Sequence, residues 1–139
     1  MRYWLFKSEP NTWSWDDQVA KGEIGEEWDG VRNYQARNNM REMSLGDLGF
    51  FYHSVDEKQI VGIVEVCREI HPDSTTEDAR WECVDIKAVA PVPDPVTLAA
   101  IKAEPRLADF ALVKQSRLSV VPVSTSEWTL ICEMGGYTC

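Results

Sequence analysis

The chain has 139 residues, of which 44% are hydrophobic and 27% charged, a balance typical of a soluble protein with one globular domain. Its 23 Asp and Glu outnumber its 14 Lys and Arg, and the resulting net charge of −9 argues against broad, non-specific binding of duplex nucleic acid. There is no signal peptide and no apolar run of membrane-spanning length. We therefore expect a cytoplasmic protein, not bound to a membrane, with a single domain over residues 1–139. A monomer is favoured, although the sequence leaves the oligomeric state open.

The first third of the chain predicts one strand followed by two helices. Residues 2–8 alternate with a period of two, which is typical of a strand, and Pro10 ends it. Ser14 and Asp17 have the spacing of a capping box, so a short helix is predicted over residues 14–22. A second helix is predicted over residues 33–43, before the turn at residues 45–47.

The rest of the chain is dominated by predicted strands. Residues 49–54 and 59–70 are separated by a turn-like VDEK segment, which predicts an antiparallel hairpin. The remaining predicted elements are a strand over 81–92, a helix over 96–104, a strand over 118–123 and a capped helix ending at Gly135. About five strands joined by hairpins rather than βαβ units predict an α+β protein with a small barrel or curled sheet.

Metal binding is not expected from the spacing of the cysteines and histidines. Cys67, Cys83, Cys132 and Cys139 are far apart, without a C-x-x-C pair, and His53 and His71 are the only histidines. Such widely spaced cysteines are more typical of reduced thiols than of a disulfide framework or zinc site. We therefore expect neither a metal ion nor another cofactor.

The segment WDGVRNYQARNN, residues 28–39, concentrates aromatic, amide and guanidinium groups in an acidic chain. On the predicted helix, Ala36, Met40 and Met43 form a core stripe, while Tyr34, Arg37, Asn38 and Arg41 lie on the other side. That second side is either a solvated face or a binding surface. Trp28 favours binding, because a ring beside the flexible Asp29-Gly30 turn can be left partly uncovered and can stack on a nucleobase. Helix amides and Arg side chains nearby suit phosphate oxygens, and Asn amides suit base edges.

Four segments in consistent order closely resemble the EVE domain family: WLFKSEP (4–10), WDGVRNYQARNN (28–39), GDLGFFYHS (46–54) and KQSRLSVVPVS (114–124). The resemblance covers nearly the whole chain. It implies a PUA-like fold, a distorted β-barrel of five or six strands with short flanking helices, related to the YTH domains that read N6-methyladenine in RNA. It also implies a non-catalytic reader of a modified base in DNA or RNA, with modified cytosines as leading candidates.

The resemblance also indicates which residues contact the nucleic acid. Lys7 and Ser8 match the strand end that lines the pocket, and Trp28 matches an aromatic wall. The other matched positions form a loop over the base, a second strand end and a rim: Asp29, Val31, Arg32 and Asn33; Tyr52, His53 and Ser54; Arg117 and Leu118. The expected phosphate contacts are Arg37, Arg41 and Lys114. The partner is thus a modified base in a single strand or flipped out of a duplex.

The other tryptophans have less specific expectations. Trp4 is expected in the core, and Trp81 and Trp128 in the core or in surface packing. Trp13 and Trp15 exceed what the family motif demands, so they either extend the aromatic cage or anchor the first helix, and anchoring is favoured for Trp15. Trp13 is also the residue best placed to act as a wedge in a duplex.

Two other functions remain open at the level of sequence. PUA-like relatives include enzymes that act on RNA or on a modified nucleoside, and Lys7, Ser8, Glu9 and His53 supply residue types that serve as nucleophile or base. Hydrogen bonding of Lys7 and Ser8 to a base edge is favoured over catalysis. Alternatively, Arg32, Arg37 and Arg117 bind an acidic protein or a small anion.

Overall fold

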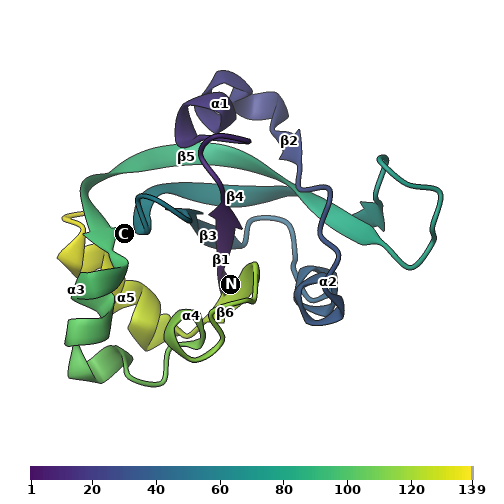
Figure 1. The fold of residues 1–139 in the computed structure, drawn as a ribbon. Helices are drawn as coiled ribbons and strands as arrows, with labels where there is room; N and C mark the ends of the chain where they lie inside the picture. Colours follow the sequence, from purple (N-terminus) through teal and green to yellow (C-terminus); the bar gives the residue numbers. More distant parts are fainter. Residues whose placement is uncertain (139) are drawn as a thin grey trace.

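The computed structural model describes residues 1–138, which form a six-stranded mixed sheet with short helices around it (Figure 1). The strands are β1 (Tyr3–Ser8), β2 (Glu26–Glu27), β3 (Leu48–His53), β4 (Gln59–Pro72), β5 (Glu82–Thr97) and β6 (Val120–Val123). The helices are α1 (Trp15–Ala20), α2 (Tyr34–Arg41), α3 (Leu98–Ala103), α4 (Ala111–Lys114) and α5 (Thr125–Met134), with 3₁₀ turns at Gly22–Ile24 and Pro105–Leu107.

The strand order is β2-β5-β4-β3-β1-β6. β1 is parallel to β3, with Ser8 opposite His53, and the other neighbouring strands are antiparallel. The predicted α+β fold of about six strands with short helices is therefore confirmed. The sheet curves strongly in Figure 1, but no pairing within residues 1–138 joins β2 to β6, so hydrogen bonds do not close it into a barrel. No helix in this part of the chain has the length and hydrophobicity needed to cross a membrane.

The predicted hairpin corresponds to β3 and β4, whereas the strand predicted to end at residue 92 continues to Thr97. β5 accommodates three prolines because its pairing with β4 is interrupted there. The register changes from Gly62–Pro91 to Ile60–Val96, so residues 92–95 have no partners in β4. Proline lacks an N–H and is tolerated where the ladder is interrupted. The helix predicted from residue 96 begins at Leu98, because the Thr97 side chain accepts a hydrogen bond from the Ala100 N–H.

The core contains the side chains that periodicity assigns to it. Ala36 and Met40 of α2 are buried, and Met43 just beyond the helix is buried as well. Trp4 is buried in β1, and its indole N–H donates to Asp47 at 3.1 Å, which satisfies the polar end of the ring. Trp128 of α5 is also buried, stacked against Tyr3 and Phe50. Buried side chains from β1, α2 and α5 thus pack together in the hydrophobic core.

Helix α1 is anchored to the sheet through Trp15. The Ser14–Asp17 capping box is present at its start, and the Trp15 N–H donates to His53 Nε2 at 3.0 Å. The Trp15 ring lies 5.4 Å from the Phe51 ring and covers Gly62 so closely that a Cβ there would approach ring atoms to 2.4 Å. Gly62 therefore leaves the space that the indole occupies, and the predicted anchoring role of Trp15 is confirmed.

The contact between Trp15 and Gly62 gives a direct test of this anchoring. We expect Gly62→Ala to lower the free energy of unfolding by about 1–3 kcal/mol, because the added methyl group collides with the indole. Urea unfolding of Gly62→Ala, Trp15→Leu and the double variant measures this. If the collision is responsible, the double variant loses less stability than the sum of the single variants, whereas additive losses would contradict it.

Candidate nucleic-acid interface

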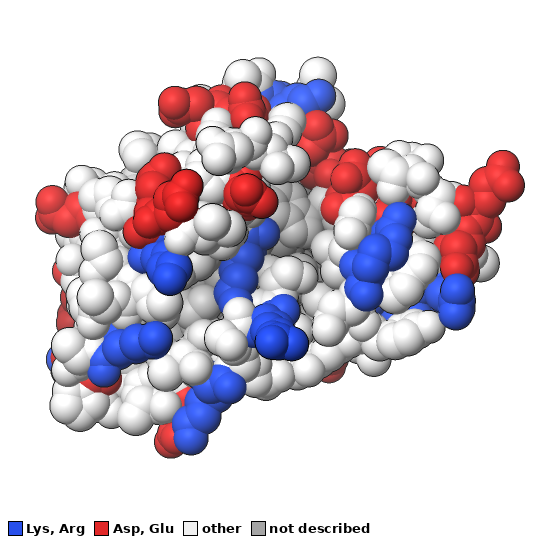
Figure 2. Space-filling view, viewed as in Figure 1, with Lys and Arg blue, Asp and Glu red and all other residues white. Residues whose placement is uncertain are grey.

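A cavity of about 450 Å³ opens beside the end of β1, between the α1 segment and the loop that follows β2. Figure 2 shows a hollow on this face, with acidic side chains gathered on the α1 side and Lys and Arg side chains on the side toward β6 and α2. The cavity is lined by Lys7, Ser8, Glu9, Thr12, Trp13, Glu26, Glu27, Trp28, Asp29, Gly30, Val31, Arg32 and Ser119. Six of the predicted binding residues, Lys7, Ser8, Trp28, Asp29, Val31 and Arg32, thus share this one concave site.

Two tryptophans form the aromatic part of the cavity. Trp28 is only 9% exposed, and its ring makes edge contacts with Phe6 and Phe51, at centroid distances of 5.5 and 5.8 Å. Trp28 is therefore a rigid wall continuous with the core, more buried than its place beside a flexible turn suggests. Trp13 is half-buried, and its indole N–H donates to Gln18 at 3.0 Å.

The cavity positions of Trp13 and Ser8 are linked. Ser8 Oγ donates to the Trp13 carbonyl, which ties the end of β1 to the segment before α1. Gln18, which accepts from the Trp13 indole, is buried and donates to the Ile86 carbonyl of β5 at 3.0 Å. Trp13 is thus held both by its main-chain carbonyl and by its indole N–H. In the sequence, this second cavity tryptophan was indicated by the two tryptophans in residues 11–17, which exceed what the family motif demands.

The loop over the cavity is held by Asp73, a residue that the sequence analysis did not select. Asp73 lies at the start of the β4–β5 turn, with a side chain only 1% exposed. Its carboxylate accepts hydrogen bonds from the Thr75 hydroxyl at 2.5 Å, the Gly30 N–H at 2.9 Å, the Thr75 N–H at 2.8 Å and Arg32 Nη1 at 3.0 Å. Burial alone would raise the pKa of Asp73, but these hydrogen bonds lower it to about 2. The available signal was the Asp-Ser-Thr sequence after Pro72, a common turn composition.

The charges lining the cavity are of both signs, with carboxylates in excess. Burial raises the pKa of Asp29, and the neighbouring Asp73, Glu27 and Glu26 carboxylates raise it further. On the opposite side, Lys7 donates to the Ser116 carbonyl at 2.9 Å, and burial lowers the pKa of its ammonium group. The site thus offers both hydrogen-bond acceptors and a cationic donor to a polar ligand.

A second hollow of about 350 Å³ lies along residues 114–118. It is lined by Asn33, Gln35, Lys114, Gln115, Ser116, Arg117 and Leu118. Asn33 caps α2 by accepting from the Ala36 N–H at 2.9 Å. Because Lys7 of the first cavity donates to Ser116 of the second hollow, the two depressions are neighbours. The predicted residues Asn33, Arg117 and Leu118 belong to this second hollow.

The three predicted residues of β3 and its end lie outside both depressions. Tyr52 is buried, and the Ser54 N–H donates to the Ser8 carbonyl at 2.9 Å. His53 is also buried, and both ring nitrogens are engaged: Nε2 accepts from the Trp15 N–H, and Nδ1 lies 3.0 Å from Glu57. Since Nε2 accepts, Nδ1 carries the proton. Here His53 supports α1 and does not form a nucleophile–base pair with Ser8.

The basic residues differ in how far they are neutralised. Arg41 is 2.6 Å from Glu82, and Lys114 is 3.5 Å from Asp109, whose side chain is 96% exposed. Arg37 bonds to Asn38 and to the Arg80 carbonyl and lies over the Tyr34 ring. Within residues 1–138 no carboxylate pairs with Arg37 or Arg117. Positive charge is therefore available at α2 and at the second hollow.

The profile of the EVE domain matches residues 2–134 of the chain. The chain belongs to the EVE domain family. Thymocyte nuclear protein 1 of Gallus gallus is 32% identical over 164 residues, which cover 95% of this chain and 68% of that protein. The corresponding human protein is 30% identical, covering 95% of this chain and 73% of that protein.

Solved structures of other EVE domain relatives have the same fold. A protein from Agrobacterium tumefaciens is 59% identical with a TM-score of 0.97, covering 99% of this chain and 94% of that one. Human THYN1 in complex with 5-methylcytosine-containing DNA is 30% identical with a TM-score of 0.92, covering all of both chains. A YTH domain of Zygosaccharomyces rouxii, bound to N6-methyladenosine RNA, is 14% identical with a TM-score of 0.58, a likeness of fold.

The Asp73 hydrogen bonds predict how stability varies with pH. The folded-state pKa of about 2 lies below the ordinary value of 3.8, so the stabilisation is fully present above about pH 4 and is lost as the pH falls toward 2. Near neutral pH we expect Asp73→Asn to lower the free energy of unfolding by about 2 kcal/mol.

Urea unfolding of wild type and Asp73→Asn between pH 7 and pH 2 measures this effect. The stability difference should narrow over the lowest two pH units. Asp56→Asn, at an exposed turn position, is the matched control and should show little difference at any pH. A difference between wild type and Asp73→Asn that stays constant across the range would show that the carboxylate charge does not stabilise the loop.

Proposed function

We propose that this EVE domain reads a modified cytosine, with the base inserted into the cavity between Trp13 and Trp28. The observation that carries the proposal is the cavity itself, where two indole rings meet carboxylates and the half-buried ammonium group of Lys7. Its volume of about 450 Å³ is within the usual range for small-ligand sites, and flat rings offer a stacking surface to any base. The human relative bound to 5-methylcytosine-containing DNA supports the same ligand class.

The polar lining suits the edge of cytosine. Cytosine presents an N4 amino donor, and Asp or Glu oxygens are its usual acceptors. Glu26 and Asp29 supply such oxygens, and the Lys7 ammonium supplies a donor for the carbonyl side of the ring. Val31 and the indoles supply apolar surface for a 5-methyl group. The cavity is therefore suited to a base that, like cytosine, carries an amino donor next to acceptor positions on its edge.

The second hollow is suited to the phosphate backbone. It adjoins the cavity through the Lys7–Ser116 hydrogen bond and is lined by Lys114 and Arg117, with Arg37 on the nearby α2. A strand that inserts one base into the cavity therefore has cations along its path. The excess acid elsewhere on the chain opposes indiscriminate duplex binding.

Binding to one oligonucleotide, with cytosine or 5-methylcytosine at a single position, tests the proposed function. We expect the modified base to bind roughly 10- to 100-fold more tightly, because one buried methyl group contributes about 1–3 kcal/mol in a fitted pocket. A single strand or mismatch should bind better than the perfect duplex, since extruding a paired base costs a few kcal/mol. Fluorescence titrations at fixed salt measure these affinities.

Variants of Trp13 provide the control for the binding site. Trp13→Ala should weaken binding by about 1–3 kcal/mol, and Trp13→Phe, which retains a stacking face, should recover most of it. Trp28 is a poorer probe because its ring is part of the core. Equal affinity for both bases would refute the modified-base function. Tightest binding to the perfect duplex would instead favour Trp13 as an inserted wedge.

The path proposed for the phosphates predicts the salt dependence of single-strand binding. With contacts from Arg37, Lys114 and Arg117, a plot of log K against log salt should have a slope of about −2, from roughly −0.7 per contact. Arg37→Ala and Arg117→Ala should each reduce its magnitude by about 0.7. Arg41→Ala is the matched control, because Glu82 already neutralises Arg41 at 2.6 Å. A slope near zero would exclude this path.

A further inference from the structure

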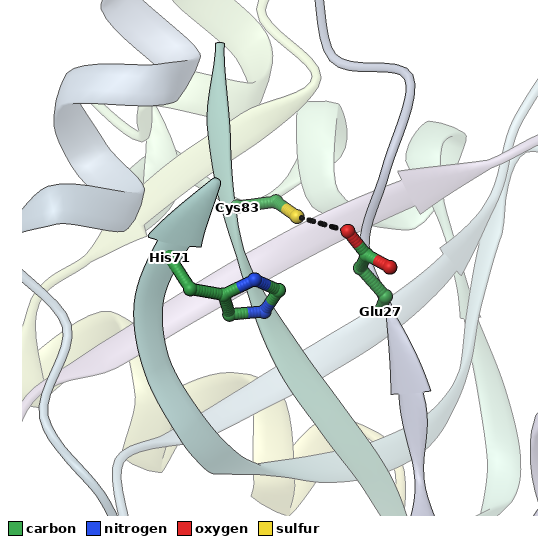
Figure 3. Close-up of side chains that lie close together, drawn as sticks. All are labelled: Glu27, His71 and Cys83. Carbon is green, nitrogen blue, oxygen red and sulfur yellow. Dashed lines mark hydrogen bonds between the residues drawn. The ribbon is translucent and has the colours of Figure 1, made fainter. Parts of the chain in front are cut away.

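Three potential metal ligands lie together on strands β2, β5 and β4, which are adjacent in the sheet. Cys83 of β5 is paired with His71 of β4, and Glu27 of β2 is paired with Asp85, two residues along β5 from Cys83. Residues two apart on a strand share a face, so Glu27, His71 and Cys83 point to the same side. Figure 3 shows the three side chains converging from their separate strands.

The donor atoms are close to the spacing of a tetrahedral metal site. One ligand atom from each residue lies within 4.8 Å of the other two, and Cys83 Sγ is 3.3 Å from Glu27 Oε1. Zinc bonds of about 2.0–2.3 Å place tetrahedral ligands roughly 3.3–3.8 Å apart. The sulfur–oxygen pair already has that separation, whereas the imidazole must rotate to bring a nitrogen to the same distance.

Neighbouring groups orient two of these ligands. His71 Nε2 lies 2.7 Å from Asp85 Oδ1, so a carboxylate holds one imidazole nitrogen, as is common for histidines that bind metals through the other. That other nitrogen, Nδ1, lies 2.9 Å from the Pro72 carbonyl. Ser74 fixes Glu27, donating from its N–H at 2.7 Å and from its hydroxyl at 2.6 Å. Glu27 is therefore fixed in place, whereas His71 Nδ1 must exchange its contact with the Pro72 carbonyl for the metal.

We propose that Glu27, His71 and Cys83 bind a divalent transition-metal ion, with Zn²⁺ the best match to this oxygen, nitrogen and sulfur donor set. Three protein ligands leave one tetrahedral position for water. The Cys83 proton, which points to Glu27 in the metal-free arrangement, passes to solvent as the sulfur–metal bond forms. Spacing along the chain hid this cluster, because β-strand pairing alone brings residues 27, 71 and 83 together. The inference does not depend on nucleic-acid binding.

Titration of the reduced, metal-free protein with Co²⁺, a spectroscopic probe for zinc sites, tests the proposal. We expect a near-ultraviolet thiolate-to-Co²⁺ band that saturates at one equivalent and disappears when Zn²⁺ displaces Co²⁺. Cys83→Ser should abolish the band, whereas Cys67→Ser, which removes a neighbouring β4 thiol, should retain it. Asp85→Asn should weaken binding by roughly 10- to 100-fold through the loss of imidazole orientation.

Thermal unfolding supplies a readout that does not depend on the thiolate band. Zn²⁺ should raise the Tm of wild type and Cys67→Ser but not that of Glu27→Gln, because an ion that binds only the folded state stabilises it. Circular dichroism establishes that the Cys83 and Glu27 variants remain folded. Absence of the Co²⁺ band in wild type, or a band of equal intensity in Cys83→Ser, would overturn the proposal.

Discussion

The parallel pairing of β1 with β3 is the constraint on which the rest of the structure depends. Parallel neighbours cannot be joined by a hairpin, so the chain must cross over between Ser8 and Leu48. That crossover contains α1, β2, the loop at residues 28–33 and α2. It therefore supplies most of the cavity lining, while β1, an inner strand between β3 and β6, supplies Lys7 and Ser8. The proposed recognition site is thus a consequence of how two parallel strands are connected.

Electrostatic pairing distinguishes the cavity from the surface around it. Most basic side chains on this acidic protein have carboxylate partners, as Arg32 has Asp73 and Arg41 has Glu82. Such pairs contribute little to attracting a polyanion, because their fields largely cancel. Among the cations without such partners, Arg37 lies on α2 and Arg117 lines the second hollow, next to a cavity rich in carboxylates. The proposed ligand matches this division of charge: the amino edge of the base meets the carboxylates of the cavity, and the phosphates meet the cations.

Local sequence patterns predicted most of the strands and helices, but few of the side-chain contacts that hold the site in place. Alternation identified the long strands, and the Ser14–Asp17 spacing identified the start of α1, because both are short-range properties. β2 and α4 were missed, since elements of two and four residues carry almost no periodic signal. For the site, the family motifs indicated Lys7, Ser8 and the 28–32 loop, which the structure does bring together. The role of His53 as an acceptor for Trp15 depends on contacts across 38 residues, which no local pattern encodes.

The turn between β4 and β5 links the two sites for which functions are proposed. Asp73 holds Gly30 and Arg32 above the cavity, and the adjacent Ser74 holds Glu27 through two hydrogen bonds. Glu27 itself lines the cavity and also faces His71 and Cys83. Any displacement of β2 must therefore disturb the loop, the turn and the side-chain cluster together. The edge strand β2 is only two residues long, so main-chain pairing alone holds it weakly. Side-chain hydrogen bonds from the β4–β5 turn to Glu27 therefore help to keep β2 in position.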